Sequence, residues 1–196
     1  MKLVAATGNK GKLKEFKEIL PEYEIISLKD LDINCDIEET GKTFEENAAI
    51  KSETICNMTG MVTFADDSGL EVDYLDGAPG IYSARYAGEG ASDEDRNKKL
   101  LSELSNVSGE KRTARYVCAI AISYPNGKTY TFKDTCEGRI TFAPEGNGGF
   151  GYDPLFYFDE FKTTLANVDA EVKNKVSHRY KALVKLKEFL NGRKQK

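Results

Sequence analysis

The first half of the chain alternates short apolar runs with segments whose apolar residues recur every three or four positions. Leu3–Ala6 is a run typical of a buried strand, and Thr7-Gly8-Asn9 interrupts it. Pro21 ends the next segment, while Thr43 followed by Glu46 is the pattern of a capping box at a helix start. These signals predict a strand at 3–6, a helix that ends at Pro21, a strand at 23–28, a polar loop at 29–42, and a helix from 44 to about 58.

The second half contains longer extended segments. Val62–Ala65 is apolar and stops abruptly at Asp66-Asp67-Ser68-Gly69, after which Leu70–Leu75 resumes an extended pattern. Pro125-Asn126-Gly127 predicts a tight hairpin turn, because Asn-Gly tolerates the positive φ that such a turn needs. The other predicted elements are an irregular loop at 76–91, a helix at 93–105, hairpin strands at 114–124 and 128–142, a glycine-rich loop at 144–152, a strand at 154–158, and a helix near 177–190.

The predicted elements follow the order β-α-β-α-β, then mostly strands, then a helix. The chain shows no internal repeat, low-complexity tract or clear linker. We therefore expect one domain over residues 1–196, of the α/β class, in which helices flank a mixed sheet.

Charge and cysteine content exclude several classes of protein. With 28 basic and 32 acidic residues, the net charge is −4, which does not favour nucleic-acid binding. The four cysteines form no C-x-x-C pair and there is one histidine, so a zinc site would lack ligands. The N-terminus does not resemble a signal peptide, and no segment approaches the ~20 apolar residues of a membrane span. We expect a soluble, cytoplasmic protein with reduced cysteines that binds neither nucleic acid nor membranes.

Thr7-Gly8-Asn9-Lys10-Gly11-Lys12 joins the first predicted strand to the first helix. A glycine-containing turn at a helix start presents free N–H groups and favours anions, and Lys12 lies within reach of a bound phosphate. The segment lacks the G-x-x-x-x-G-K-[ST] spacing of a P-loop. It predicts a phosphate site, and the alternative is an ordinary β-α turn with solvated lysines.

Carboxylates gather in two segments. Asp66-Asp67 follows an apolar strand, where α/β proteins commonly bind ligands, and adjacent strand residues point to opposite sides. Glu38-Glu39 lies in the acidic loop. Carboxylate oxygens suit Mg²⁺ and can activate water, although either segment alone is also compatible with a solvated acidic loop.

Two segments near the C-terminus could bind a base. Gly148–Pro154 carries Phe150 and Tyr152 among glycines, which lets a planar base stack on either ring, unless both rings fill the core. Ser177-His178-Arg179 offers donors suited to the oxygen and N7 of a purine, unless Ser177 simply caps the last helix.

The ordered set of motifs resembles the inosine triphosphate pyrophosphatase family, also called XTP/dITP diphosphatases. The resemblance covers residue 3 to about residue 190. The matching segments are Thr7-Gly8-Asn9-x-x-Lys12, Glu38-Glu39-Thr40-Gly41, Phe44-x-x-Asn47-Ala48 with Lys51, Ala65-Asp66-Asp67-Ser68-Gly69-Leu70, Gly77-x-Pro79-Gly80-x-Tyr82-Ser83-Ala84-Arg85, Gly149-Phe150-Gly151-Tyr152-Asp153-Pro154, and Lys173-Asn174-x-x-Ser177-His178-Arg179.

This resemblance implies an elongated mixed sheet, two lobes with the active-site cleft between them, a homodimer, and a requirement for Mg²⁺. It implies hydrolysis of ITP, dITP and XTP to the nucleoside monophosphate and pyrophosphate. Asp67 would be the catalytic carboxylate and would share Mg²⁺ with Glu38, although Glu39 remains an alternative. The implied substrate contacts are Thr7, Gly8, Asn9, Lys10, Gly11, Lys12 and Lys51 to the phosphates, Ser68 to the substrate, and Phe150, Gly151, Tyr152, Asp153, Lys173, His178 and Arg179 mainly to the base.

The chain departs from the family pattern at Leu165-Ala166-Asn167-Val168 and at Val172, which leaves open how the segment before Lys173 packs. Two other functions remain open: a nucleotide sensor without catalysis, and a pyrophosphatase for pyrimidine or modified nucleotides. A sensor would not need a carboxylate that activates water, and a pyrimidine enzyme would not need the Ser177-His178-Arg179 cluster.

Overall fold

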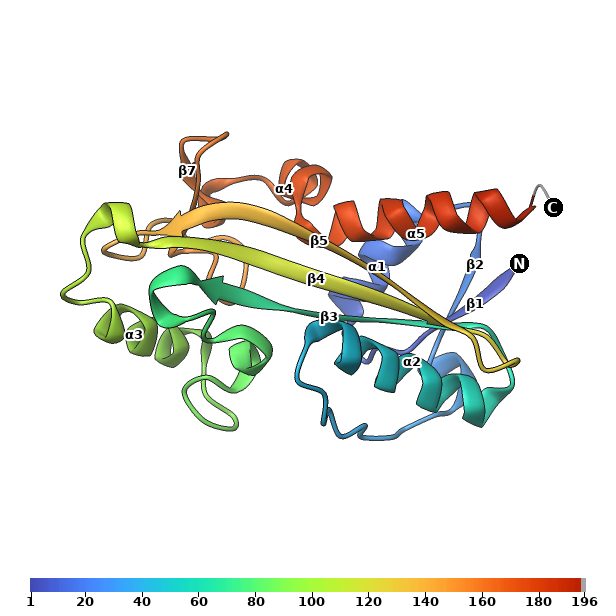
Figure 1. Ribbon diagram of the computed structural model, residues 1–196. Coiled ribbons are helices and arrows are strands. Elements are labelled where there is room, and N and C mark those ends of the chain that lie inside the picture. Colours follow the sequence, from blue (N-terminus) through green and yellow to red (C-terminus); the bar gives the residue numbers. More distant parts are fainter. Residues whose placement is uncertain (195–196) are drawn as a thin grey trace. The chain divides into compact units, whose positions relative to one another are not determined.

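A computed structural model describes residues 1–194 and contains a mixed seven-stranded sheet in the order β2-β1-β3-β4-β5-β6-β7 (Figure 1). Strand β1 pairs in parallel with β2 and β3, whereas β6 is antiparallel to β5 and β7. The predicted α/β class with a mixed sheet is confirmed. The strands are β1 Lys2–Ala5, β2 Glu24–Ser27, β3 Thr63–Val72, β4 Thr113–Ser123, β5 Thr129–Ile140, β6 Phe156–Phe158 and β7 Thr163–Thr164; the helices are α1 Lys10–Ile19, α2 Phe44–Thr59, α3 Asp93–Glu103, α4 Ala170–Val176 and α5 His178–Lys194.

The chain divides into two compact units. Unit 1 comprises Met1–Asp67, Cys118–Asp134 and the chain from Arg179 onward, and unit 2 comprises Ser68–Val117 and Thr135–His178. A single functional domain and a cleft between two lobes stay predictions.

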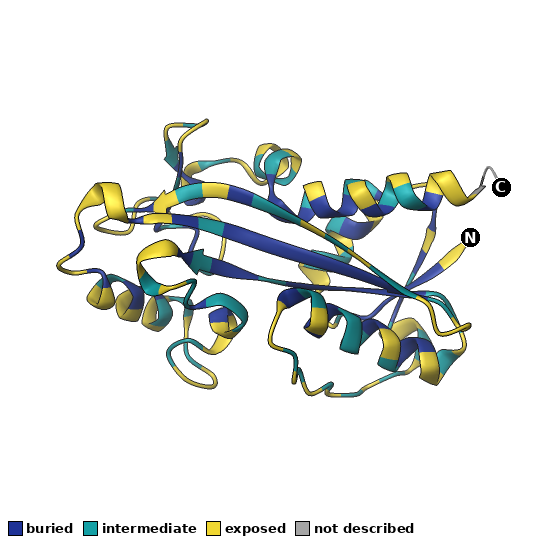
Figure 2. Cartoon of the chain, in the orientation of Figure 1, coloured by how far each residue is buried: buried dark blue, intermediate teal, exposed yellow. Residues whose placement is uncertain are grey.

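The core of unit 1 forms on both faces of β1, because successive strand residues point to opposite sides. Leu3 and Ala5 pack into a cluster with side chains of α1 and α5, while Val4 packs with Ile55 of α2. Figure 1 shows α1, α5 and α2 around β1, and Figure 2 shows that most of this strand is buried. Full burial of each large apolar side chain contributes about 1.5–3 kcal/mol relative to its exposure. Because β1 is packed on both faces, it holds the start of the loop at residues 6–9 in a fixed position.

The core of unit 2 joins α3 to its strands. Leu100 and Leu104 pack in one cluster with Tyr116 and Phe156. Arg112 is also buried, and its guanidinium donates to the carbonyls of residues 104, 140 and 141 at 2.8–3.0 Å. These bonds join the end of α3 to the end of β5. The same cluster contains Tyr152, which anchors the glycine-rich loop of residues 144–152.

The predicted break at Asp66-Asp67-Ser68-Gly69 is wrong, because β3 runs without interruption through these residues. The strand lies between β1 and β4 and is buried along most of its length, so its backbone groups have partners. The acidic pair is tolerated inside the strand because buried cations meet both carboxylates. The sequence predictions also missed β7, α4 and the 3₁₀ segment Gly80–Arg85.

Candidate active site

Strand pairing brings the first two predicted motifs together. Ala5 of β1 is paired with Phe64 of β3, and the N–H of Ala6 donates to the Phe64 carbonyl at 2.8 Å. Asp66 therefore lies beside the turn that leads into α1. Its Oδ2 atom is 2.9 Å from Nζ of Lys12, and only 1% of the Asp66 side chain is exposed.

The N-terminus of α1 already has a cap. The Asn9 side chain accepts from the N–H groups of Gly11 at 2.8 Å and Lys12 at 3.1 Å, and Thr7 Oγ1 accepts from the Asn9 N–H at 3.2 Å. These bonds fix the turn. They also mean that a phosphate would compete with Asn9 for two of the helix N–H groups.

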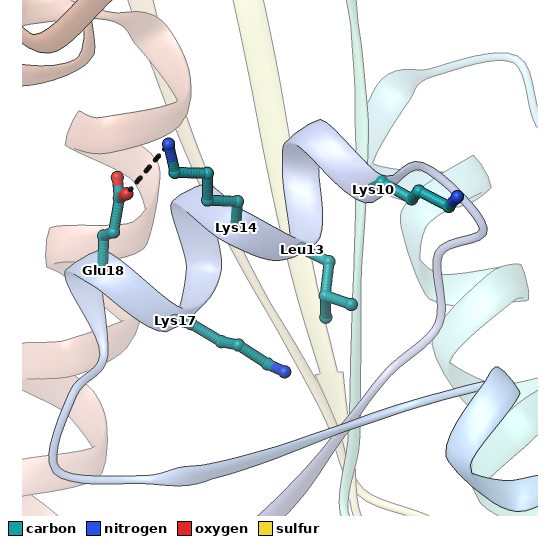
Figure 3. A pocket seen from close by; sticks show the side chains of 5 residues that line it. All are labelled: Lys10, Leu13, Lys14, Lys17 and Glu18. Atoms are coloured by element: carbon teal, nitrogen blue, oxygen red, sulfur yellow. Dashed lines mark ion pairs between the residues drawn. The ribbon is translucent and has the colours of Figure 1, made fainter.

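Lys10 also borders an open hollow of about 360 Å³ on α1 (Figure 3). Leu13, Lys14, Lys17 and Glu18 line the rest of the hollow, and none of them is a predicted site residue. The hollow is a lysine-rich surface of one helix, and neither Asp66 nor Asp67 lines it.

Arg179 in the first turn of α5 completes a buried ionic network. Its Nε lies 3.2 Å from Oδ2 of Asp66 and its Nη1 lies 2.9 Å from Oε2 of Glu15. Burial alone raises the pKa of Asp66, but Lys12 and Arg179 outweigh it and hold the pKa well below its usual value. Arg179 thus has ionic partners in unit 1, and its predicted contact with the base stays a prediction.

Asp67 is the centre of a second group. Its Oδ2 accepts from Nδ2 of Asn47 at 3.2 Å, and its Oδ1 lies 3.4 Å from Nζ of Lys51. Lys51 is also 2.7 Å from Oε1 of Glu39. Burial raises the pKa of Asp67, and the charge of Lys51 opposes that rise. A carboxylate of raised pKa, held by an amide and an ammonium, is suited to general acid–base catalysis.

The donor set fits one Mg²⁺ held mainly by substrate. Within residues 1–194, no cluster of three His, Cys, Asp or Glu residues is placed to hold a metal. Mg²⁺ commonly takes only one or two protein carboxylates and fills the rest of its shell with water and phosphate oxygens. Asp67 and Glu39 already contact one shared cation, the Lys51 ammonium. Glu38 is exposed, and its role as a metal ligand stays a prediction.

In unit 2, Asp153 organises the glycine-rich loop. Its Oδ2 accepts from the N–H of Phe150 at 2.9 Å and contacts Nζ of Lys173, and its Oδ1 accepts from the hydroxyl of Tyr116 at 3.3 Å. Asp153 is 1% exposed, so its carboxylate holds the loop in place from the buried side.

The two aromatic residues of this loop have different environments. Phe150 is 61% exposed, and Nζ of Lys173 lies 4.6 Å from its ring centroid. Tyr152 belongs to the unit 2 core, where its hydroxyl donates to the Ser83 carbonyl at 2.8 Å. The exposed ring of Phe150 is therefore accessible for stacking with a base. A contact between Tyr152 and a base stays a prediction.

Ser177, His178 and Ser68 lie in unit 2 as well. His178 is buried, and its ring stacks on Tyr116 with centroids 5.0 Å apart and an interplanar angle of 13°. Ser177 directly precedes α5, as a cap would, and Ser68 is half-buried in β3.

Comparison with known proteins identifies the family of the chain. Residues 3–189 match the Ham1 family over nearly the whole chain. The chain belongs to the Ham1 family. A dITP/XTP pyrophosphatase of Geobacter sulfurreducens is 53% identical over 96% of both chains. One of Bacillus licheniformis is 51% identical over 96% of this chain and 97% of its own. The resemblance inferred from the ordered motifs is confirmed.

Solved Ham1 structures share the fold. The Ham1 protein of Staphylococcus aureus matches with a TM-score of 0.92 at 46% identity, covering 98% of this chain and all of its own. A HAM1 protein of Coxiella burnetii also gives 0.92, at 39% identity, and covers 98% and 99% of the two chains.

Sequence reasoning did not single out several residues that contact the predicted site residues. Glu15, Tyr116 and Asp93 were not singled out, and the Gly151 N–H donates to Asp93 at 2.6 Å. Asn47 was noted only as part of a family motif. The family motif was the only feature of the sequence that pointed to Asn47, because a single amide side chain on a helix forms no recognisable sequence pattern.

Proposed function

We propose that this chain hydrolyses ITP, dITP and XTP to the nucleoside monophosphate and pyrophosphate, with Mg²⁺ as cofactor. The observation that carries the proposal is the buried Asp67 carboxylate, which Asn47 and Lys51 hold in the same unit as Lys12. The names of the Geobacter and Bacillus relatives agree with it.

The residues of unit 1 divide the chemistry among them. Lys12 and Lys51 bind the phosphates and stabilise the negative charge that develops on them. Asp67 orients the attacking water and accepts its proton. When bound, Mg²⁺ neutralises phosphate charge, and Asp67 with Glu38 or Glu39 would hold it. Attack at the α-phosphorus leaves pyrophosphate as the departing group.

Residues of unit 2 receive the base. The exposed ring of Phe150 stacks on a purine, and His178 donates to the oxygen at C6 of hypoxanthine or xanthine. Adenine carries an amino donor at C6, so a donor would face a donor. A site of this kind rejects ATP by about 10²–10⁴-fold in kcat/KM.

We propose further that the protein is cytoplasmic and forms a homodimer. None of the four cysteines, all within residues 1–194, forms a disulfide, as is usual for proteins of a reducing compartment. No helix of the described chain combines the length and apolar character that a membrane span requires. The dimer rests on the family resemblance alone, and sedimentation equilibrium of the purified chain tests it.

Product identification tests the reaction. ITP, dITP, XTP, GTP and ATP are incubated with the protein and Mg²⁺, and the products are separated by ion exchange. We expect inosine or xanthosine monophosphate with pyrophosphate in equal amounts. Nucleoside diphosphate with orthophosphate would contradict the proposal. Binding of ITP without turnover, with Mg²⁺ present or chelated, would establish the nucleotide sensor instead, and preferred turnover of pyrimidine nucleotides would establish the other alternative.

A further inference from the structure

We propose that Tyr116 positions the base-binding residues of unit 2: its ring fixes the plane of the His178 imidazole, and its hydroxyl fixes the Asp153 carboxylate. The inference rests on the proposed function, because its effect on selectivity appears only if the chain turns over purine nucleotides. No motif of the sequence singled out this residue.

Tyr116 contacts two predicted site segments, Gly148–Pro154 and Ser177-His178-Arg179. It lies on β4, is 9% exposed, and stacks on His178 at 5.0 Å with nearly parallel rings. Its hydroxyl donates to Oδ1 of Asp153 at 3.3 Å. The other oxygen of Asp153 accepts from Phe150 N–H and contacts Lys173. One side chain therefore connects the histidine to the loop that carries Phe150.

The surroundings keep the Tyr116 ring in one place. Phe156 packs against it with ring centroids 4.6 Å apart and an interplanar angle of 42°. Burial, reinforced by the neighbouring Asp153 charge, raises the pKa of Tyr116 well above its usual value. The hydroxyl thus stays protonated and donates to the carboxylate at neutral pH.

The stacked geometry determines where His178 can donate. Ring N–H bonds lie in the plane of the imidazole, so an imidazole parallel to the phenol directs its donors sideways, away from the Tyr116 face. A histidine free to rotate would meet the C6 oxygen of a purine less often and would discriminate less against adenine. The ring therefore controls base selectivity, and the hydroxyl controls the order of the loop.

Two variants separate these roles. Tyr116→Phe keeps the ring and removes the hydroxyl, so KM for ITP should rise about tenfold while the ratio of kcat/KM for ITP over ATP stays at the wild-type value. Tyr116→Leu removes both, and this ratio should fall at least about tenfold. Tyr86→Phe is the matched control, since it also removes a tyrosine–carboxylate hydrogen bond in unit 2, to Glu103, and should change neither value.

A spectroscopic measurement tests the stack without substrate. His178 is the only histidine of the chain, so an untagged protein gives a single set of imidazole resonances. In wild type and in Tyr116→Phe, the aromatic ring should shift the imidazole protons upfield, and Tyr116→Leu should remove the shift. Thermal unfolding of each variant verifies that it is folded.

Unshifted imidazole protons in the wild-type protein would overturn the inference. So would a Tyr116→Leu protein that turns over ITP with the wild-type ratio of ITP to ATP. Failure of the wild-type protein to release pyrophosphate would overturn the proposed function instead, and the resonances of His178 would still report whether the rings stack.

Discussion

The carboxylate of Asp66 and the guanidinium of Arg179 form a buried ion pair, with Nε 3.2 Å from Oδ2 and side-chain exposures of 1% and 5%. The pair ties the third strand of the chain to the first turn of its last helix. Because Lys12 also contacts Oδ2 of Asp66, loss of this carboxylate leaves two cations without their shared partner.

Asp66→Asn should therefore destabilise the protein by about 3 kcal/mol or more, as removal of one member of a buried ion pair does. Glu18→Gln is the control, because it breaks the exposed Lys14–Glu18 pair of α1 at a cost below about 0.5 kcal/mol. Urea unfolding at pH 7 measures both. Equal free energies of unfolding for the two variants would contradict this account of the network.

The same network predicts how stability depends on pH. Although burial raises the pKa of Asp66, Lys12 and Arg179 lower it further, so it is lower in the folded than in the unfolded protein. Its contribution is then fully present above the unfolded pKa of about 3.9 and is lost as pH falls towards the folded value. The difference in free energy of unfolding between wild type and Asp66→Asn should be constant from pH 5 to 7 and shrink below about pH 4.

Asp67→Asn should leave the fold intact and lower kcat for ITP by about 10²-fold or more, because the amide cannot accept the proton of water. Steady-state kinetics with a pyrophosphate assay measure the loss. Asp66→Asn in the same assay, at a temperature where it is folded, should lose less, since Asp66 faces Lys12 and Arg179. The catalytic assignment would move to Asp66 if the order were reversed.

Phe150→Ala should raise KM for ITP roughly tenfold or more with little change in stability, because the exposed ring is available for stacking. Phe142→Ala is a close control. Phe142 is 68% exposed and lies over Arg112 at 4.4 Å, much as Phe150 lies over Lys173, but it belongs to no predicted site. A similar KM for both variants would argue against base stacking on Phe150.

Substitution by alanine should have different effects at two glycines of the glycine-rich loop, Gly149 and Gly151. Gly149 has φ +73°, and an added Cβ would collide with the Asp153 carboxylate and lie 2.9 Å from its Cβ. Gly151 has φ +63° but open space around it. Gly151→Ala should cost about 1–2 kcal/mol of stability from the backbone alone. Gly149→Ala should also raise KM for ITP about tenfold, because it displaces Asp153 from Phe150 and Lys173. Equal KM values would show that the Asp153 contacts do not affect binding.

The long helices were predictable because their apolar residues recur on the one buried face, and the central strands because burial on both faces leaves a continuous apolar run. The turn over residues 7–12 and the exposed Phe150 were singled out from residue types placed after a strand or among glycines, whereas the choice of Asp67 over Asp66 came from the family resemblance. The continuity of β3 through Asp66 did not follow, since a sequence does not show which cations will meet an acidic residue. Helix α4 has no buried side chain and therefore leaves no apolar pattern to detect.

The pair His178-Arg179 shows why neighbours in sequence need not share a role. Both were predicted to contact the base. Successive helix residues point about 100° apart, at 3.6 residues per turn. The structure stacks His178 on Tyr116 in unit 2 and pairs Arg179 with Asp66 and Glu15 in unit 1. Their spacing in the sequence gives no sign of this division.

Neither unit is a continuous stretch of chain, and the last segment of unit 1 begins only at Arg179. On the ribosome, Asp66 would emerge long before the helix that supplies its arginine partner. Unit 1 would stay incomplete until α5 left the exit tunnel, so nascent chains would depend on late closure of distant segments, which is slow when contacts are far apart in sequence. A premature stop before Arg179 would remove that helix and the arginine partner of Asp66, and the truncated product would become a substrate for proteolysis rather than a weaker enzyme.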